Sequence, residues 1–286
     1  MHSLIAVVAL CLASSPLMAQ DSSVAHHDTA VTHHDTGGAP HNPAVAAQIR
    51  AGDSLETALQ PDAALARFRA ALALDSTNYE ALWKAARSTS NIAKQIDSDD
   101  NALKKRRDSL YLVAQTLAEA AVASDPKGSQ GHSMLAQAIG RLSRTRSGKE
   151  RVRFAMTIYN EAMTAVDLDS TNDPAYHVLG AWHAEIKRLS GLQRFFAKSL
   201  FGADFMNKAN WDDARKYMLR AVALNPQNIY HHLELAQIYV DLKKYDRARE
   251  QLTLIHDLPI KDVLDPKYKH DAETLLNDIR DKKEYS

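Results

Sequence analysis

The sequence predicts an all-α solenoid, a stack of helical hairpins each packed on the next. Its composition supports helices, since Ala and Leu are abundant and the 286 residues include only 10 Gly and 9 Pro. Turn-rich β proteins need more of both residues. A second observation is a pattern of small and large apolar residues that recurs at a period close to 34 residues, which is typical of helical repeats.

The clearest repeat spans residues 229–262. Its first helix is expected to carry Leu235, Ala236 and Tyr239, and its second helix Ala248 and Leu252. A large–small pair one turn before an aromatic residue, followed by a small residue on the next helix, is the tetratricopeptide pattern. Small residues at 236 and 248 allow the paired helices to approach closely.

The same pattern recurs upstream and predicts about five hairpins. Four second helices end in similar short runs, LALDS, ASDP, VDLDS and ALNP, in which an Asp or Asn with Ser or Pro stops one helix and begins the next turn. The small and apolar residues in register are Ala64, Phe68, Ala71, Ala114, Ala118, Ala121, Ala162, Ala165, Ala214, Met218 and Ala221. An amphipathic segment, 265–282, is expected to cap the last repeat through Ala272, Leu275, Leu276 and Ile279.

The N-terminal 42 residues are not expected to join the repeat domain, which we place at 43–286. Residues 1–19 contain no charged side chain except the terminus and His2, and a short apolar run leads to Ala19. We interpret them as a secretory signal peptide, so an exported, periplasmic or secreted protein is expected. Residues 20–42 contain HHDT twice and few large apolar residues, which is typical of a disordered His-rich linker. An alternative role for this segment is the binding of Zn²⁺ or Ni²⁺ by its histidine imidazoles.

One repeat carries an insertion of about 22 residues. Tyr176, Leu179, Gly180 and His183 occupy the expected positions of a first helix, but the matching alanine of the second helix is Ala214. His183 then fills the aromatic packing position. His177 lies six residues before it, not the four that a helical metal site needs, so no metal site is expected.

The insertion is rich in phenylalanine. Leu192, Phe195, Phe196 and Leu200 share one face of a helix, and Phe201 and Phe205 follow. One interpretation is a further helix packed into the core. The other is that Phe195, Phe196, Leu200, Phe201 and Phe205 contact an apolar ligand or a membrane surface.

A basic stretch, residues 141–153, carries Arg141, Arg144, Arg146, Lys149, Arg151 and Arg153 against Glu150 alone. It is either a solvated loop or a contact for phosphate or anionic headgroups. Nucleic acid is not expected, because the stretch has little aromatic interleaving and the whole chain has 35 basic and 35 acidic residues.

The register also predicts which side chains face the concave groove of the solenoid. Repeat proteins bind partners along this face. The partner-binding candidates are Trp83, Arg87, Gln137, Arg141, His177, Tyr230, Leu233 and Gln237. They lack the Lys and Asn clamp by which some repeats hold a terminal carboxylate.

Three blocks of sequence resemble the regulator of microtubule dynamics family: GKERVRF (148–154), HVLGAWHAEI (177–186) and LSGLQRFFAKSLFG (189–202). The resemblance covers about residues 45–280 and implies an all-helical binding domain without catalysis. In eukaryotes it implies an association with microtubules, with mitochondrial or reticular membranes and with lipid handling. The predicted export signal would separate this chain from tubulin, so we do not expect the microtubule role.

The leading hypothesis is therefore an exported, non-catalytic scaffold that binds a protein or peptide in its groove. The alternative is the binding or carriage of a lipid by the groove and the Phe-rich insertion. No enzyme and no cofactor are expected, since the chain lacks G-x-S-x-G, P-loop and HExxH motifs, and its one cysteine, Cys11, lies in the signal segment.

Overall fold

The computed structural model describes residues 42–146, 148–191, 199 and 204–284. The described residues belong to one unit, 41–286, and everything below concerns this unit. The predicted signal peptide and all of the predicted linker except Asn42 lie outside the described residues. All the regular secondary structure of the described part is helical.

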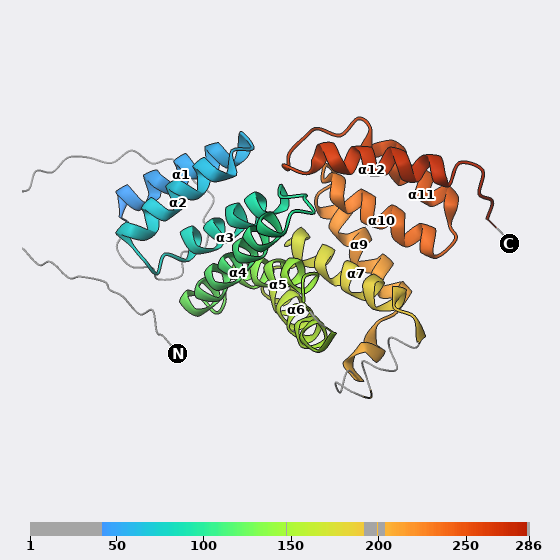
Figure 1. The fold of residues 1–286 in the computed structure, drawn as a ribbon, viewed down its shortest axis with the longest axis horizontal. Helices are drawn as coiled ribbons and strands as arrows, with labels where there is room; N and C mark the ends of the chain where they lie inside the picture. The colour runs from blue at the N-terminus through green and yellow to red at the C-terminus, as the bar shows by residue number, and fades with distance from the viewer. Residues whose placement is uncertain (1–41, 147, 192–198, 200–203, 285–286) are drawn as a thin grey trace, which may run out of the picture. The chain divides into compact units, whose positions relative to one another are not determined.

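Ten of these helices form five consecutive hairpins, and a last helix follows them (Figure 1). The hairpins are α1 (Pro43–Thr57) with α2 (Pro61–Leu74), α3 (Tyr79–Lys94) with α4 (Asn101–Ser124), α5 (Ser129–Ser143) with α6 (Gly148–Leu168), α7 (Asp173–Arg188) with α9 (Trp211–Leu224), and α10 (Ile229–Asp241) with α11 (Tyr245–Ile255). A 3₁₀ helix, η1 (Asp204–Lys208), precedes α9, and α12 (Asp265–Asp278) ends the array. This confirms the predicted solenoid.

Asparagine residues cap α3, α7 and α10, the first helices of three hairpins. Asn78, Asn172 and Asn228 each accept a backbone N–H three residues on, at 3.0, 3.1 and 3.2 Å respectively. Each asparagine therefore satisfies a donor that the first turn of a helix leaves unpaired. The residue three positions earlier, Asp or Asn, ends the preceding helix, which explains why LALDS, VDLDS and ALNP recur in the sequence.

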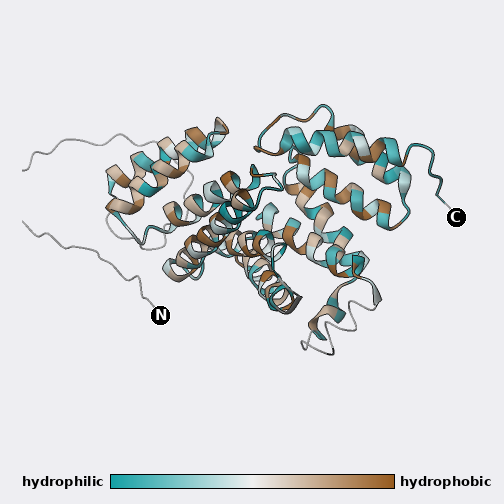
Figure 2. Ribbon diagram, viewed as in Figure 1, coloured by the Kyte–Doolittle hydropathy of each residue, from teal (hydrophilic) through white to brown (hydrophobic). Residues whose placement is uncertain are grey.

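The alanines that set the repeat register are in the core. Each hairpin contributes a fully buried alanine from its second helix: Ala64, Ala114, Ala162, Ala214 and Ala248 are all 0% exposed. Hydrophobic and hydrophilic residues alternate around the helices (Figure 2). Larger side chains such as Phe68, Met218 and Leu235 fill the space beside the alanines. The helices thus pack closely where small residues face each other.

The helices α7 and α9 pair closely although residues 189–210 separate them. A Cβ atom placed on Gly180 would lie 3.1 Å from the Ala214 carbonyl oxygen and 3.1 Å from the Met218 amide nitrogen. Gly180 therefore permits a close backbone contact, and any larger residue would force the two helices to shift. This pairing confirms that the insertion lies inside the fourth hairpin.

The last helix, α12, packs on α10 and α11. Tyr268, Ala272 and Ile279 are buried at 7, 2 and 1% exposure, so the helix covers the end of the apolar core as predicted. In the described part of the chain, none of the helices has the length and apolar character that crossing a bilayer requires.

Candidate ligand-binding cavity

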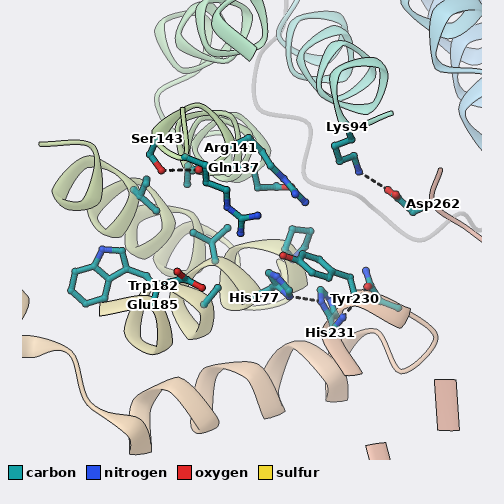
Figure 3. A pocket seen from close by; sticks show the side chains of 18 of the residues that line it. Lys94, Gln137, Arg141, Ser143, His177, Trp182, Glu185, Tyr230, His231 and Asp262 are labelled. Atoms are coloured by element: carbon teal, nitrogen blue, oxygen red, sulfur yellow. Dashed lines mark hydrogen bonds and ion pairs between the residues drawn. The ribbon is translucent and has the colours of Figure 1, made fainter. Parts of the chain in front are cut away.

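The first helices of four neighbouring hairpins surround a half-open cavity of about 750 Å³. Its walls come from α3, α5, α7 and α10, with α6, η1, α12 and the loop before α12. This volume lies within the range of sites that hold small molecules or inserted side chains. Figure 3 shows its lining residues, with Arg141 and Gln137 extending from one side toward His177 and Tyr230 on the other.

Arg141, on α5, supplies an unpaired positive charge to the cavity. Its guanidinium lies 5.6 Å from the centre of the Tyr230 ring and 3.5 Å from the Tyr268 hydroxyl. No described carboxylate lies within 4.0 Å of it. A guanidinium stays protonated in proteins and offers a planar fork of donors, so this wall is suited to an oxyanion.

An ion pair at the cavity wall joins the end of α3 to the loop before α12. The Lys94 ammonium, at the end of α3, lies 2.8 Å from the Asp262 carboxylate in the loop before α12. Burial lowers the pKa of Lys94. Burial alone would raise the pKa of Asp262, but Lys94 and the Leu264 amide hold that pKa below its ordinary value. The loop is thereby attached to a helix 168 residues away in the sequence.

We expect Asp262→Asn to lower the free energy of unfolding by about 1 kcal/mol at pH 7, since Lys94 loses its charged partner. The value is small because the Asp262 side chain is 37% exposed. A carboxylate with a lowered pKa stabilises the fold above its unfolded pKa and loses this effect as the pH falls through its folded pKa. The difference from wild type should therefore shrink as the pH falls below the ordinary Asp value of 3.8.

Urea unfolding at pH 7 and pH 3 measures this difference. Asp271→Asn is the matched control, because Asp271 pairs with Lys267 on the surface of the same C-terminal region. It should change stability by less than about 0.5 kcal/mol. An equal loss in both variants would contradict a special role for the Lys94–Asp262 pair.

Two buried histidines and an aspartate form a chain of hydrogen bonds at the cavity wall. His177 Nδ1 lies 2.9 Å from His231 Nδ1, and His231 Nε2 lies 2.8 Å from Asp173 Oδ2. Asn225 also donates to Asp173, at 3.2 Å. The His177 ring packs on Tyr230 with 4.4 Å between ring centres. Burial, His231 and the two arginines Arg141 and Arg144 lower the pKa of His177 well below its ordinary value.

The opposite wall is apolar. Val152, Ile158, Trp182, Ile186 and Met206 line the cavity and belong to one buried cluster. The Trp182 indole donates to the Ala155 carbonyl at 2.7 Å, which fixes the ring. The cavity is therefore amphipathic, with cationic donors on α3 and α5 and hydrocarbon on α6 and α7.

The structure brings five of the eight predicted groove residues to this cavity: Arg87, Gln137, Arg141, His177 and Tyr230. The other three do not line it. Trp83 packs half-buried beside the core with the Arg87 guanidinium 5.2 Å from its ring, and Gln237 is half-buried elsewhere on α10. Leu233 lies in the core at 2% exposure, so it offers no surface to a partner.

Of the predicted apolar contacts, only Phe205 can be placed. It packs half-buried near Trp182, with 6.3 Å between ring centres, as part of the apolar cluster. Phe195, Phe196, Leu200 and Phe201 lie outside the described residues. Within the basic stretch, Arg141, Arg144 and Arg151 line the cavity, whereas Arg153 is exposed and does not.

Sequence reasoning missed several polar residues of the cavity: Lys94, Glu185, His231, Asp262 and Tyr268. His231 follows a predicted anchor, Tyr230, and its adjacency to a second histidine was the one available signal. Nothing in the repeat pattern indicated that the loop before α12 would reach α3. In the described part of the chain, no group of three His, Cys, Asp or Glu side chains is arranged to hold a metal ion.

The fold and the cavity define a helical-repeat scaffold of the tetratricopeptide class. A thermophilic tetratricopeptide protein from Thermus thermophilus has the same fold, with a TM-score of 0.57, 22% identity, and coverage of 81% of this chain and all of the other. A Pseudomonas aeruginosa structure titled as a functional characterization of pilF reaches a TM-score of 0.50 at 15% identity, covering 83% of this chain and 92% of the other.

The chain belongs to the regulator of microtubule dynamics protein 1-3 family, whose model matches residues 48–280. It is 24% identical over 195 residues to regulator of microtubule dynamics protein 3 of Rattus norvegicus, and 26% identical over 212 residues to protein 1 of Bos taurus. These matches cover 68 and 73% of this chain. The chain spans less than two thirds of either relative, 40 and 64% of their lengths.

Proposed function

We propose that this scaffold binds a segment of a partner protein in the cavity, and that the segment carries an acidic group beside apolar side chains. One observation supports this most strongly: Arg141 has no carboxylate partner among the described residues and faces a wall of Val152, Ile158 and Trp182. Helical repeats present such surfaces to extended partners along their first helices.

The charges around the cavity favour an acidic segment over a basic one. The basic lining residues outnumber the acidic ones: Arg87, Lys94, Arg141, Arg144, Arg151 and Lys261 against Glu185, Asp262 and Asp265. Lys94 is neutralised by Asp262, and Arg87 approaches Glu56 at 3.5 Å. The Asp265 carboxylate accepts hydrogen bonds from the backbone amides of Lys261 and Asp262. Arg141, Arg144 and Arg151 therefore leave the cavity lining with an excess of positive charge.

Gly140→Leu tests the cavity without removing a charge. A Cβ atom on Gly140 meets no heavy atom within 4 Å, and Gly140 lines the cavity, so a leucine there enters the empty space. We expect the variant to fold and to lose partner capture by at least about tenfold, because the leucine occupies the volume of the inserted side chain. The measurement is crosslinking of the folded wild type and variant to partners in their native compartment, quantified by mass spectrometry. Equal capture by both proteins would contradict the proposal.

A second candidate, an anionic amphiphile such as a fatty acid or acidic lipid, is favoured by the volume and the two-sided lining of the cavity. Its headgroup would meet Arg141 and its hydrocarbon would meet α6, α7 and Met206. Native mass spectrometry of purified protein, followed by organic extraction, separates this candidate from the first. An amphiphile bound in stoichiometric amount to the wild type and absent from Gly140→Leu would favour the lipid candidate. A mass equal to that of the protein alone would favour the protein partner.

We also propose that the protein is exported, on the basis of the apolar N-terminal segment. Expression of the full chain in a bacterial host and intact-mass measurement of the processed protein test this, and cleavage after Ala19 is the expected result. We do not extend to this chain the microtubule role named for its relatives, because export would separate the protein from tubulin.

A further inference from the structure

The hydrogen-bond chain from Asp173 through His231 to His177 determines what His177 presents to the cavity. An ionised carboxylate can only accept hydrogen bonds, so His231 Nε2, 2.8 Å from Asp173, carries a proton. In a neutral His231 ring, Nδ1 is then an acceptor, and it takes its hydrogen bond from His177 Nδ1 at 2.9 Å. His177 Nε2 is left without a proton, and no described residue bonds to it.

A single added proton reverses this arrangement. When His231 is an imidazolium, both its nitrogens donate, so its Nδ1–H points to His177 Nδ1. His177 must then carry its own proton on Nε2. His177 is 8% exposed and lines the cavity, so its Nε2 changes from a hydrogen-bond acceptor to a donor at the site where a ligand would bind.

The surrounding charges place the extra proton on His231 and not on His177. Arg141 and Arg144 on α5 both face His177, whereas Asp173 on α7 bonds directly to His231. Among the described residues, the Tyr230 phenol on α10 also packs on His177, and burial keeps it protonated by raising its pKa. A positive charge is therefore most stable at the end of the chain next to Asp173.

We propose that the Asp173–His231–His177 chain is a proton-controlled specificity switch for the anion site at Arg141. With both histidines neutral, the cavity selects an oxyanion that carries an adjacent O–H or N–H donor for His177. With one proton added, it selects an oxyanion that has no donor, since Arg141 and His177 then both donate. This rests on the proposed function, because it requires that the cavity binds an anionic group.

Decanesulfonate is a suitable probe, since its sulfonate stays ionised across the range tested and has no donor. Isothermal titration below its micelle concentration should show about tenfold tighter binding at pH 5.5 than at pH 8, the difference expected for one charge-assisted hydrogen bond. The donor-bearing anion 2-hydroxydecanoate should bind more tightly than decanesulfonate at pH 8, and this preference should be lost at pH 5.5.

Three variants test whether the pH dependence of binding arises from the Asp173–His231–His177 chain. His177→Gln should remove the pH dependence, whereas His270→Gln, on the exposed surface of α12, should retain it. Asp173→Asn should weaken the pH dependence, because an amide can donate as well as accept and no longer fixes the proton on His231 Nε2. A pH dependence that persists in His177→Gln would overturn the switch.

Imidazole ¹⁵N spectra of the ligand-free protein give a second readout that does not depend on binding. At pH 8, His231 should be protonated on Nε2 and His177 on Nδ1. Any other pair of tautomers overturns the proposal. If decanesulfonate binding requires Arg141 but has the same affinity at both pH values, the switch is overturned and the anion site at Arg141 stands. No binding of any amphiphile at either pH overturns the switch, and it also removes the amphiphile candidate.

Discussion

Replacing Gly180 by leucine is expected to unfold the C-terminal half of the repeat domain or to lower its free energy of unfolding by about 3 kcal/mol or more. Gly180 lies where α7 crosses α9. A Cβ atom there would already lie 3.1 Å from the backbone of both Ala214 and Met218. Backbone atoms inside a helix cannot move aside as a flexible side chain can, so a leucine has to push the two helices apart.

The loss should exceed what leucine gains in helix propensity over glycine, which is about 1 kcal/mol. Thermal unfolding followed by circular dichroism measures it, and a fall in Tm of roughly 10 °C is expected for a domain of this size. Gly140→Leu is the matched control, because it makes the same change in a helix of the same domain with open space around the Cβ atom. Equal melting temperatures for both variants would show that α7 and α9 do not make this close backbone contact.

Replacing Arg141 by glutamine is expected to weaken binding of an anionic ligand in the cavity by about 10- to 100-fold. A hydrogen bond to a charged group contributes about 1.5–3 kcal/mol, and the planar fork of arginine makes two. Arg141→Lys should recover only part of the affinity, because an ammonium lacks the fork and cannot reproduce its contacts with Tyr230 and Tyr268.

Titration with decanesulfonate measures this affinity, with circular dichroism to verify folding of each variant. Arg153→Gln removes the same charge from the basic stretch at an exposed position outside the cavity. It should change the affinity less than about threefold, since exposed charges are screened by salt. Equal losses for Arg141→Gln and Arg153→Gln would mean that only the overall charge of the domain matters.

The repeat architecture could be predicted from the sequence because packing imposes it locally. Wherever two helices approach closely, the chain needs alanine or glycine, and Ala64, Ala114, Ala214 and Ala248 are spaced accordingly. The turns are equally local, since each Asn cap bonds to an amide three residues away. Even the displaced pairing of Gly180 with Ala214 followed from matching the repeat pattern on either side of the insertion.

The binding site was less predictable because it depends on contacts between distant residues. The repeat register correctly placed Arg141 and His177 on the inner face. It also placed Leu233 there, but Leu233 is buried in the core with residues of α11 and α12. Asp262 and Tyr268 reach the cavity from outside the repeat pattern. Whether a side chain on the inner face is free, paired or covered is decided by elements that the periodicity does not describe.

The ion pair between Lys94 and Asp262 has a consequence for how this array can change over time. In an ordinary solenoid, each repeat touches only its neighbours, so whole repeats can be gained or lost without disturbing the others. Here the end of α3 meets the loop before α12, and Arg141 meets Tyr268, across 168 and 127 residues of sequence respectively. Deleting or duplicating one hairpin between them would move both contacts out of reach. These two contacts therefore constrain how many hairpins can lie between α3 and α12.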